Sequence, residues 1–233
     1  MTELAAVDLP AFDLVAFDIA GTTVNDGGAV YDALRICVEE LGATVAPADL
    51  QHWMGTDKVT AIDNLARLGG IEADHETVLA AFDRFRAILA ETYAAHPPQA
   101  IDGAAATFAA LRAQGVKVAL TTGFDRAVVE PLLASLGWGA EQLDAVVTTD
   151  DVPAGRPAPY MIFRAMERCG VQDVSRVIAV GDTAVDVQAG RNAGATAIGV
   201  LTGQTGRELL AAAGPHHILD SVADLPALVA AGR

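Results

Sequence analysis

Residues 13–23 of this 233-residue chain read Asp-Leu-Val-Ala-Phe-Asp-Ile-Ala-Gly-Thr-Thr. The apolar run within residues 12–17 is short and ends at Asp18, which is typical of a buried strand in a parallel sheet. The Gly-Thr-Thr sequence at 21–23 favours a tight turn. This stretch therefore predicts a buried strand whose carboxyl end presents an aspartate.

After this strand, the spacing of apolar residues first predicts a run of helices and then predicts strands that alternate with helices. Helices are expected over residues 29–42, from Pro47, over 56–68 and over 74–93. Beyond Pro98, strands are expected at 116–120, 145–147, 177–180 and 196–200, with helices at 103–114, 126–135, 159–169 and 186–193. Alternating strands and helices predict an α/β fold with a helix-covered parallel sheet. The four consecutive helices predict an inserted α-helical cap at 28–99, with the α/β core formed by 1–27 and 100–233.

The composition excludes several classes of protein. Apolar residues make up 52 % of the chain, too many for a disordered protein. Acidic residues outnumber basic ones by 30 to 15, so the net charge is −15. This balance argues against nucleic acid and against an anionic membrane surface as partners. We also expect no signal peptide at the acidic start and no transmembrane helix, because no apolar run approaches ~18 residues.

Cysteine use indicates a reducing compartment. The two cysteines, Cys37 and Cys169, form neither a disulfide framework nor a zinc-binding pattern. Buried free thiols in a cytoplasmic protein are therefore expected. The adjacent His216 and His217 are expected to lie in a solvated loop rather than to bind a metal.

Polar residues follow several of the predicted strands. Asp18 follows the strand at 12–17, Thr122 and Gly123 follow that at 116–120, and Asp182 and Asp186 follow that at 177–180. In parallel sheets the carboxyl ends of the strands share one crevice, where ligands bind. Any one aspartate could instead be a helix N-cap, but that alternative does not explain all of these loops together.

The aspartates and one arginine together indicate phosphoryl chemistry. Asp18, Asp182 and Asp186 would repel one another unless a cation lay between them, and oxygen ligands suit Mg²⁺. The Thr122 hydroxyl and the backbone N–H groups near Gly21 and Gly123 can donate to phosphoryl oxygens. Arg156, in the segment 153–157, supplies a planar cationic fork for the same group.

These four loops, in this order, resemble the four motifs of the haloacid dehalogenase superfamily. The resemblance spans nearly the whole chain and implies a Rossmann-like core with helices on both faces and an inserted cap. It also implies that Asp18 attacks phosphorus to form an aspartyl-phosphate. Mg²⁺ would be bound by Asp18, the Ala20 carbonyl and Asp182, with help from Asp186.

Two departures from the general pattern indicate a subfamily. Phosphatases of the superfamily have a general acid two residues after the nucleophile, where this chain has Ala20. The basic residue of the third motif is usually Lys, and here it is Arg156. Both features, and the string Asp-Asp-Val-Pro-Ala-Gly-Arg-Pro at 150–157, resemble the phosphonoacetaldehyde hydrolases (phosphonatases), which cleave a carbon–phosphorus bond.

The resemblance also covers a lysine in the cap. Cleaving C–P leaves an electron pair on carbon, and a Lys Schiff base with a neighbouring carbonyl can accept it. Met54-Gly55-Thr56-Asp57-Lys58 matches the phosphonatase pattern, which implies this role for Lys58. With Thr56 as N-cap, Lys58 would lie in a first helical turn, where the helix dipole disfavours an ammonium. The alternative is a solvated surface lysine paired with Asp57.

Other phosphonatase residues are absent. The histidine three residues after the lysine, thought to relay its protons, is Ala61; a cysteine after the first motif is Gly28; and a tyrosine after the second motif is Phe124. The substrate could therefore be another carbonyl phosphonate. His52 is a candidate to replace the missing relay.

The sequence thus predicts an Mg²⁺-dependent hydrolase of phosphonoacetaldehyde or a related small carbonyl phosphonate. The expected catalytic residues are Asp18, Lys58, Thr122 and Arg156, and the expected substrate-binding residues are Gly21, Thr22, Met54, Gly123 and Phe124. The alternatives are a phosphatase for a small phosphate ester and a non-enzymatic sensor of a phosphorylated metabolite. Trp53 and Met54 could line the substrate cleft or hold the cap against the core. Related enzymes often dimerise through cap helices, so these two residues could instead serve a homodimer through the cap.

Overall fold

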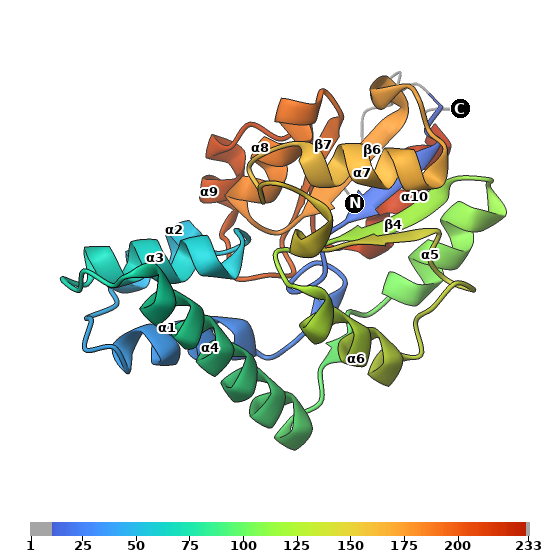
Figure 1. Ribbon diagram of the computed structural model, residues 1–233. Helices are drawn as coiled ribbons and strands as arrows, with labels where there is room; N and C mark the ends of the chain where they lie inside the picture. The colour runs from blue at the N-terminus through green and yellow to red at the C-terminus, as the bar shows by residue number, and fades with distance from the viewer. Residues whose placement is uncertain (1–10, 232–233) are drawn as a thin grey trace.

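A parallel sheet forms the centre of the computed structural model, which describes residues 11–231 (Figure 1). Within these residues the main sheet has six strands in the order β5-β4-β1-β6-β7-β8. Their bounds are Leu14–Phe17 (β1), Lys117–Thr121 (β4), Ala145–Val147 (β5), Val177–Gly181 (β6), Thr196–Val200 (β7) and His217–Leu219 (β8). All neighbouring strands pair in parallel, which confirms the predicted α/β fold.

Helices cover both faces of this sheet, because side chains alternate along each strand. Along β1, Leu14 and Ala16 pack with side chains of α7 (Tyr160–Cys169) and α8 (Ala184–Ala193). Val15 and Phe17 point to the other face. There they join side chains of α5 (Ala104–Ala113), α6 (Arg126–Leu136) and α10 (Leu225–Ala231). The central strand β1 is therefore buried on both faces, and Asp18, which follows it, is buried as well.

A helical insert leaves the core after β2 (Val24–Asn25) and returns through β3 (Gln99–Ala100). These two short strands pair antiparallel, so the outgoing and returning chains lie side by side. Between them lie α1 (Ala29–Glu39), α2 (Pro47–Trp53), α3 (Lys58–Leu68) and α4 (His75–Ala95), which pack on one another beside the core (Figure 1). These are the helices assigned to the cap, whose boundaries at 28 and 99 stay a prediction.

The structure corrects the predicted start of α3. The helix begins at Lys58, and its N-cap is Asp57 rather than Thr56, because the Asp57 carboxylate accepts a hydrogen bond from the Thr60 N–H at 2.8 Å. The Thr56 hydroxyl instead donates to the Trp53 carbonyl at 2.6 Å. Lys58 nonetheless lies in the first helical turn, as expected.

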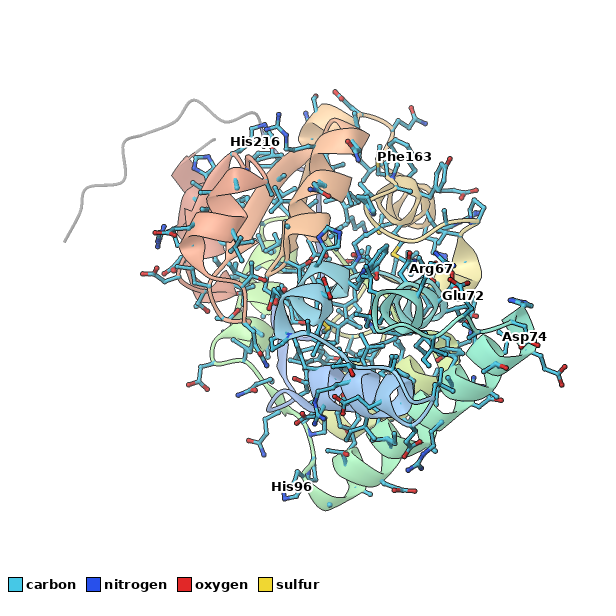
Figure 2. All side chains as sticks on the ribbon, turned by 90° about the vertical axis from the view of Figure 1, so that its left-hand side faces the viewer. Arg67, Glu72, Asp74, His96, Phe163 and His216 are labelled. Carbon is cyan, nitrogen blue, oxygen red and sulfur yellow. The ribbon has the colours of Figure 1, made fainter. Side chains whose placement is uncertain are left out.

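Several short elements were not predicted. These are β2, β3, β8, α9 (Arg207–Ala212), α10 and three 3₁₀ turns at Thr149–Asp151, Val174–Arg176 and Val222–Asp224. The solvated loop expected at His216 and His217 is wrong, because β8 begins at His217 and pairs with β7. His216 Nδ1 accepts a hydrogen bond from the Ala197 N–H at 2.9 Å. In Figure 2, His216 lies on the core at the opposite end of the molecule from His96, which follows α4.

In residues 11–231, no helix combines the length and the apolar character needed to cross a membrane. The start of the chain, where no signal peptide was expected, lies outside the described residues.

Candidate active site

Three aspartates meet at the carboxyl ends of β1 and β6. Asp18 follows β1, Asp182 follows β6, and Asp186 lies in the first turn of α8. All three are buried, and each offers a carboxylate oxygen within 4.8 Å of the others. The structure thus brings together the predicted acidic cluster.

Asp182 lies in a space that glycines leave open. A Cβ at Gly21 would lie 2.5 Å from Asp182 Oδ2, and one at Gly203 would overlap the same oxygen. The Thr22 hydroxyl donates to Asp182 Oδ1 at 2.9 Å. Burial and the charge of Asp18 raise the pKa of Asp182 to about 7. A carboxylate held in this way beside a second one fits a divalent cation, which would stabilise both in their charged form.

Arg156 lies among these carboxylates. It is 5 % exposed, its Nη2 donates to Asp18 Oδ1 at 2.7 Å, and its Nη1 forms an ion pair with Asp186 Oδ1. Asp186 Oδ2 accepts from the Thr183 N–H at 3.0 Å and from the Thr183 hydroxyl. Both oxygens of Asp186 therefore have protein partners, so this residue fixes the position of Arg156.

A cavity of about 180 Å³ opens in front of the acidic cluster. Ten predicted residues line it: Asp18, Ala20, Gly21, Met54, Lys58, Thr122, Gly123, Phe124, Arg156 and Asp182. Two others do not. Thr22 is fully buried and holds Asp182, and Asp186 is buried against Arg156.

Lys58 is buried in this cavity and only 4 % exposed, so the alternative of a solvated surface lysine is wrong. Its Nζ donates to the Thr56 carbonyl at 3.1 Å and lies 5.6 Å from the centroid of the Phe124 ring. Burial, followed by the charge of Arg156, lowers the pKa of Lys58 to about 8. A substantial fraction of this amine is therefore neutral near physiological pH, as attack on a carbonyl requires.

The loop that precedes Lys58 packs tightly on the core. A Cβ at Gly123 would overlap the Thr56 carbonyl oxygen, and one at Gly55 would overlap the Thr183 hydroxyl. On a third side, a Cβ at Gly155 would lie 3.2 Å from the Asp57 Cβ. Three core loops thus hold the loop 54–58, so that Lys58 of the insert lines the same cavity as Asp18 of the core.

Sequence reasoning missed part of the cavity wall. Asn25, Asp26 and Tyr31 line it, as does the segment Thr202-Gly203-Gln204. The segment directly follows β7, so the rule that parallel strand ends share a crevice could have indicated it. Tyr31 lies in the first turn of α1, where neither a motif nor a charge distinguishes it in the sequence.

The structure shows where His52 and Ala61, the two residues considered for the proton relay, lie. His52 is exposed and lines a separate groove between α2 and α9, so it is wrong as a replacement relay. Ala61 is fully buried in the apolar core, and no side chain there takes the place of the histidine. The buried thiol expected at Cys37 is confirmed, and burial raises its pKa to about 12. Cys169, which was also expected to be buried, is only half-buried.

A family model described as haloacid dehalogenase-like hydrolase matches residues 12–194. The chain belongs to this family of hydrolases. The match contains all of the carboxylates described above, as well as Lys58 and Arg156.

Curated relatives of this haloacid dehalogenase-like hydrolase include phosphonoacetaldehyde hydrolases. One from Bacillus cereus is 31 % identical over 200 residues, covering 80 % of this chain and 74 % of the relative. One from Parabacteroides distasonis is 35 % identical over 152 residues, which cover 55 % of this chain but only 58 % of the relative. A solved structure of a phosphonoacetaldehyde hydrolase-like protein from Oleispira antarctica has a TM-score of 0.80 at 26 % identity, covering 99 % of this chain and 95 % of that one.

Proposed function

We propose that this hydrolase cleaves the C–P bond of phosphonoacetaldehyde or a related small carbonyl phosphonate. The observation that carries the proposal is the placement of Lys58. It is a buried lysine with a lowered pKa that lines the same cavity as Asp18, in a chain with Ala20 in place of a general acid. The similarity to phosphonoacetaldehyde hydrolases supports the same conclusion.

The phosphoryl half of the site consists of core residues. The carboxylates of Asp18 and Asp182, with the Ala20 carbonyl, would hold Mg²⁺ and leave Asp186 to position Arg156. When bound, the ion would supply positive charge that offsets the carboxylates and polarises the phosphoryl group. Arg156 and Thr122 would donate hydrogen bonds to the transferring oxygens, while Asp18 attacks phosphorus.

The carbon half of the site depends on Lys58. Its neutral amine would attack the substrate carbonyl, and the adduct would take up one proton and lose water to form an iminium. As Asp18 attacks phosphorus, the C–P electron pair would move into the iminium to give an enamine. Hydrolysis of the aspartyl-phosphate and of the enamine would then release phosphate and the carbonyl product and restore both residues.

Ala20 distinguishes this proposal from a phosphate-ester phosphatase. An alkoxide leaving group needs a proton, and superfamily phosphatases have an acid at this position. In this chain, Ala20 lines the cavity and offers no proton to a leaving oxygen. An enamine leaving group needs none at that atom, because its electron pair is delocalised onto nitrogen.

We also propose that the helices of residues 28–99 act as a cap that opens to admit substrate and closes to bring in Lys58. The glycines at 55 and 123 support this proposal. Each lies where the loop 54–58 packs against the core so closely that a Cβ would clash, which fits a closed state of the cap. The homodimer through the cap and the cytoplasmic location stay predictions.

The test is reductive trapping. The protein is incubated with Mg²⁺ and phosphonoacetaldehyde, borohydride is added, and adducts are mapped by mass spectrometry; phosphate release is assayed in parallel without borohydride. We expect an adduct on Lys58 and release of phosphate. The chain has one other lysine, Lys117, which is exposed on β4 and pairs with Asp144.

Lys117→Arg is therefore a matched control for Lys58→Arg. We expect Lys58→Arg to abolish both the adduct and phosphate release, and Lys117→Arg to change neither. Phosphate release that survives Lys58→Arg would contradict the Schiff-base mechanism.

A further inference from the structure

One ion pair joins the helical insert to the core in the part of the chain that the structure describes. Arg86 on α4 donates from Nη1 to Asp125 Oδ2 at 2.9 Å. The other ion pairs within residues 11–231 lie inside the insert or inside the core. Gln51 Nε2 also donates to the Thr205 hydroxyl across this boundary, at 3.1 Å, but that hydrogen bond is neutral. The Arg86 pair is therefore the charged link between the two parts.

Asp125 is the last of three consecutive core residues that face the insert. A Cβ at Gly123 would overlap the Thr56 carbonyl oxygen. The ring centroid of Phe124 lies 5.6 Å from Lys58 Nζ. Asp125 then accepts from the arginine of α4. The segment 123–125 thus contacts both the loop that carries the lysine and the helix that carries the arginine.

Each partner of this ion pair is fixed within its own part of the molecule. Asp125 is 8 % exposed, and its Oδ1 accepts from the Val128 N–H at 3.1 Å as the N-cap of α6. Arg86 also pairs with Asp83, and its guanidinium carbon lies 4.8 Å from the centroid of the Phe82 ring. Neither group is free to follow the other, so movement of the insert away from the core would break the pair.

A groove of about 640 Å³ lies between α4 and α6 beside this ion pair. Arg86 and Leu89 line it from the insert, and Val128 and Leu132 line it from the core. Because the groove separates the two helices here, close packing does not hold them together along its length. The ion pair provides the attraction across this edge of the insert.

We propose that Arg86 is a positioning residue, whose ion pair with Asp125 holds the insert on the core and thereby keeps Lys58 in the cavity. This proposal rests on the Schiff-base function proposed above. Arg86 does not line the cavity, and it acts through the segment 123–125. Loss of the pair lowers the fraction of molecules in which Lys58 is in place, and Schiff-base formation slows with that fraction.

The experiment uses Arg86→Gln, Asp125→Asn and the double variant. Asparagine keeps an oxygen that can cap α6, so Asp125→Asn removes the charge and preserves the helix start. Arg84→Gln is the matched control. Arg84 lies on the same helix, but it pairs with Glu40 inside the insert.

Two measurements are made on each variant. Rapid-quench borohydride trapping with phosphonoacetaldehyde gives the rate of adduct formation at Lys58. Hydrogen exchange, followed by mass spectrometry without substrate, reports local opening of the backbone at 54–60, with β1 and β6 as references for the core. The second measurement does not depend on the chemistry of the lysine.

We expect Arg86→Gln to slow trapping by about tenfold, between the effects of losing an exposed and a buried ion pair. Exchange at 54–60 should rise, while exchange in β1 and β6 should not change. The double variant should be no slower than either single variant, because each removes the same interaction. Arg84→Gln should match wild type in both measurements.

Unchanged exchange at 54–60 in Arg86→Gln would overturn the positioning role. A rise that extended equally to β1 and β6 would also overturn it, since the change would then be a general loss of stability. Single effects that multiply in the double variant would show that the two residues act independently. Absence of any adduct at Lys58 in wild type would overturn the proposed function, while exchange at 54–60 would still decide whether the ion pair holds the insert in place.

Discussion

The Nζ atom of Lys58 lies 5.6 Å from the centroid of the Phe124 ring, and the two residues come from different parts of the chain that close on one cavity. The ring excludes water from the amine and offers it only a weak cation–π contact. Exclusion of water disfavours the ammonium, and burial is the largest cause of the lowered pKa. The placement of Phe124 thus supports the neutral amine that the proposed chemistry needs.

The reactivity of Lys58 should therefore depend on pH in a distinctive way. Because its folded-state pKa is lowered to about 8, the neutral fraction rises with pH through 8 and then levels off. At pH 7 about 10 % of Lys58 is neutral, against less than about 0.1 % of an ordinary lysine. Labelling of Lys58 and Lys117 by a carbonyl reagent and borohydride, followed across pH 6–10 by mass spectrometry, measures this directly. A Lys58 profile that keeps rising to pH 10, like that of an exposed lysine, would contradict the prediction.

Gly123→Ala tests the seating of the loop 54–58. The added Cβ would overlap the Thr56 carbonyl oxygen and displace the backbone that precedes Lys58. A displacement of about 1 Å can lower turnover by about a hundredfold, so we expect a loss of that order in kcat/KM. Gly139→Ala is the matched control, since a Cβ there meets no atom within 4 Å. Unchanged kcat/KM in Gly123→Ala would show that the loop does not need this contact.

Binding of Mg²⁺ should stabilise the fold through Asp182. We expect Mg²⁺ to raise the Tm of wild type, because it would offset the repulsion between buried Asp18 and Asp182, and chelation to reverse the rise. Asp182→Asn should abolish the response, whereas Asp220→Asn, at a side chain 85 % exposed, should preserve it. Thermal scans with and without Mg²⁺ provide the measurement. An equal response in Asp182→Asn and wild type would place the ion elsewhere.

Ala20→Asp distinguishes C–P cleavage from ester hydrolysis. The new carboxyl group would lie in the cavity and could protonate an alkoxide, so turnover of an aryl phosphate should rise. Turnover of phosphonoacetaldehyde should not rise, because its leaving group needs no proton there. Ala20→Asn is the control of similar size without an acidic proton. If phosphonoacetaldehyde gave no phosphate in any variant while Ala20→Asp became an efficient phosphatase, the ester alternative would be favoured.

The charges that line the cavity predict selectivity against a second anion on the substrate. Among the described lining residues, Lys58 and Arg156 are the only cations, and Asp26 adds a negative charge on the insert side. A carbonyl phosphonate that also carries a carboxylate would find no further cation. We expect its kcat/KM to be at least about tenfold below that of phosphonoacetaldehyde. Comparable values for the two substrates would contradict this.

The fold was predictable where a strong local pattern coincides with burial. The strands around Asp18 and Asp182 are short apolar runs buried on both faces, and their position beside turn residues indicated the parallel sheet. The edge strand β8 was missed because its three residues, His217–Leu219, are too few and too mixed in polarity for a period to be recognised. Its pairing with β7 is a tertiary contact that no local pattern encodes.

The site was predictable where its residues follow strands and carry charge. The structure brings Asp18 and Asp182 together, as their places after parallel strands predicted. It also places the cation Arg156 beside Asp18, as the need to offset the carboxylate charge predicted. The role of Tyr31 as cavity wall depends on how α1 packs against the core, and the exclusion of His52 depends on the direction of α2. Both are set by packing between helices, so spacing along the sequence could not distinguish them.

The returning connection of the insert is hydrogen-bonded to the loop that follows Asp18. The Ile101 N–H, just after β3, donates to the Thr23 carbonyl at 2.9 Å, and the Thr23 hydroxyl donates to the Asp18 carbonyl at 2.9 Å. Because β2 and β3 are also paired, the two connections cannot shift independently. In the proposed opening of the cap, movement that carries Lys58 away would therefore also pull on the backbone of Asp18 through these hydrogen bonds. Under the proposed function, laboratory evolution of the helical insert toward new carbon skeletons would alter the timing of phosphoryl transfer as well as the choice of substrate.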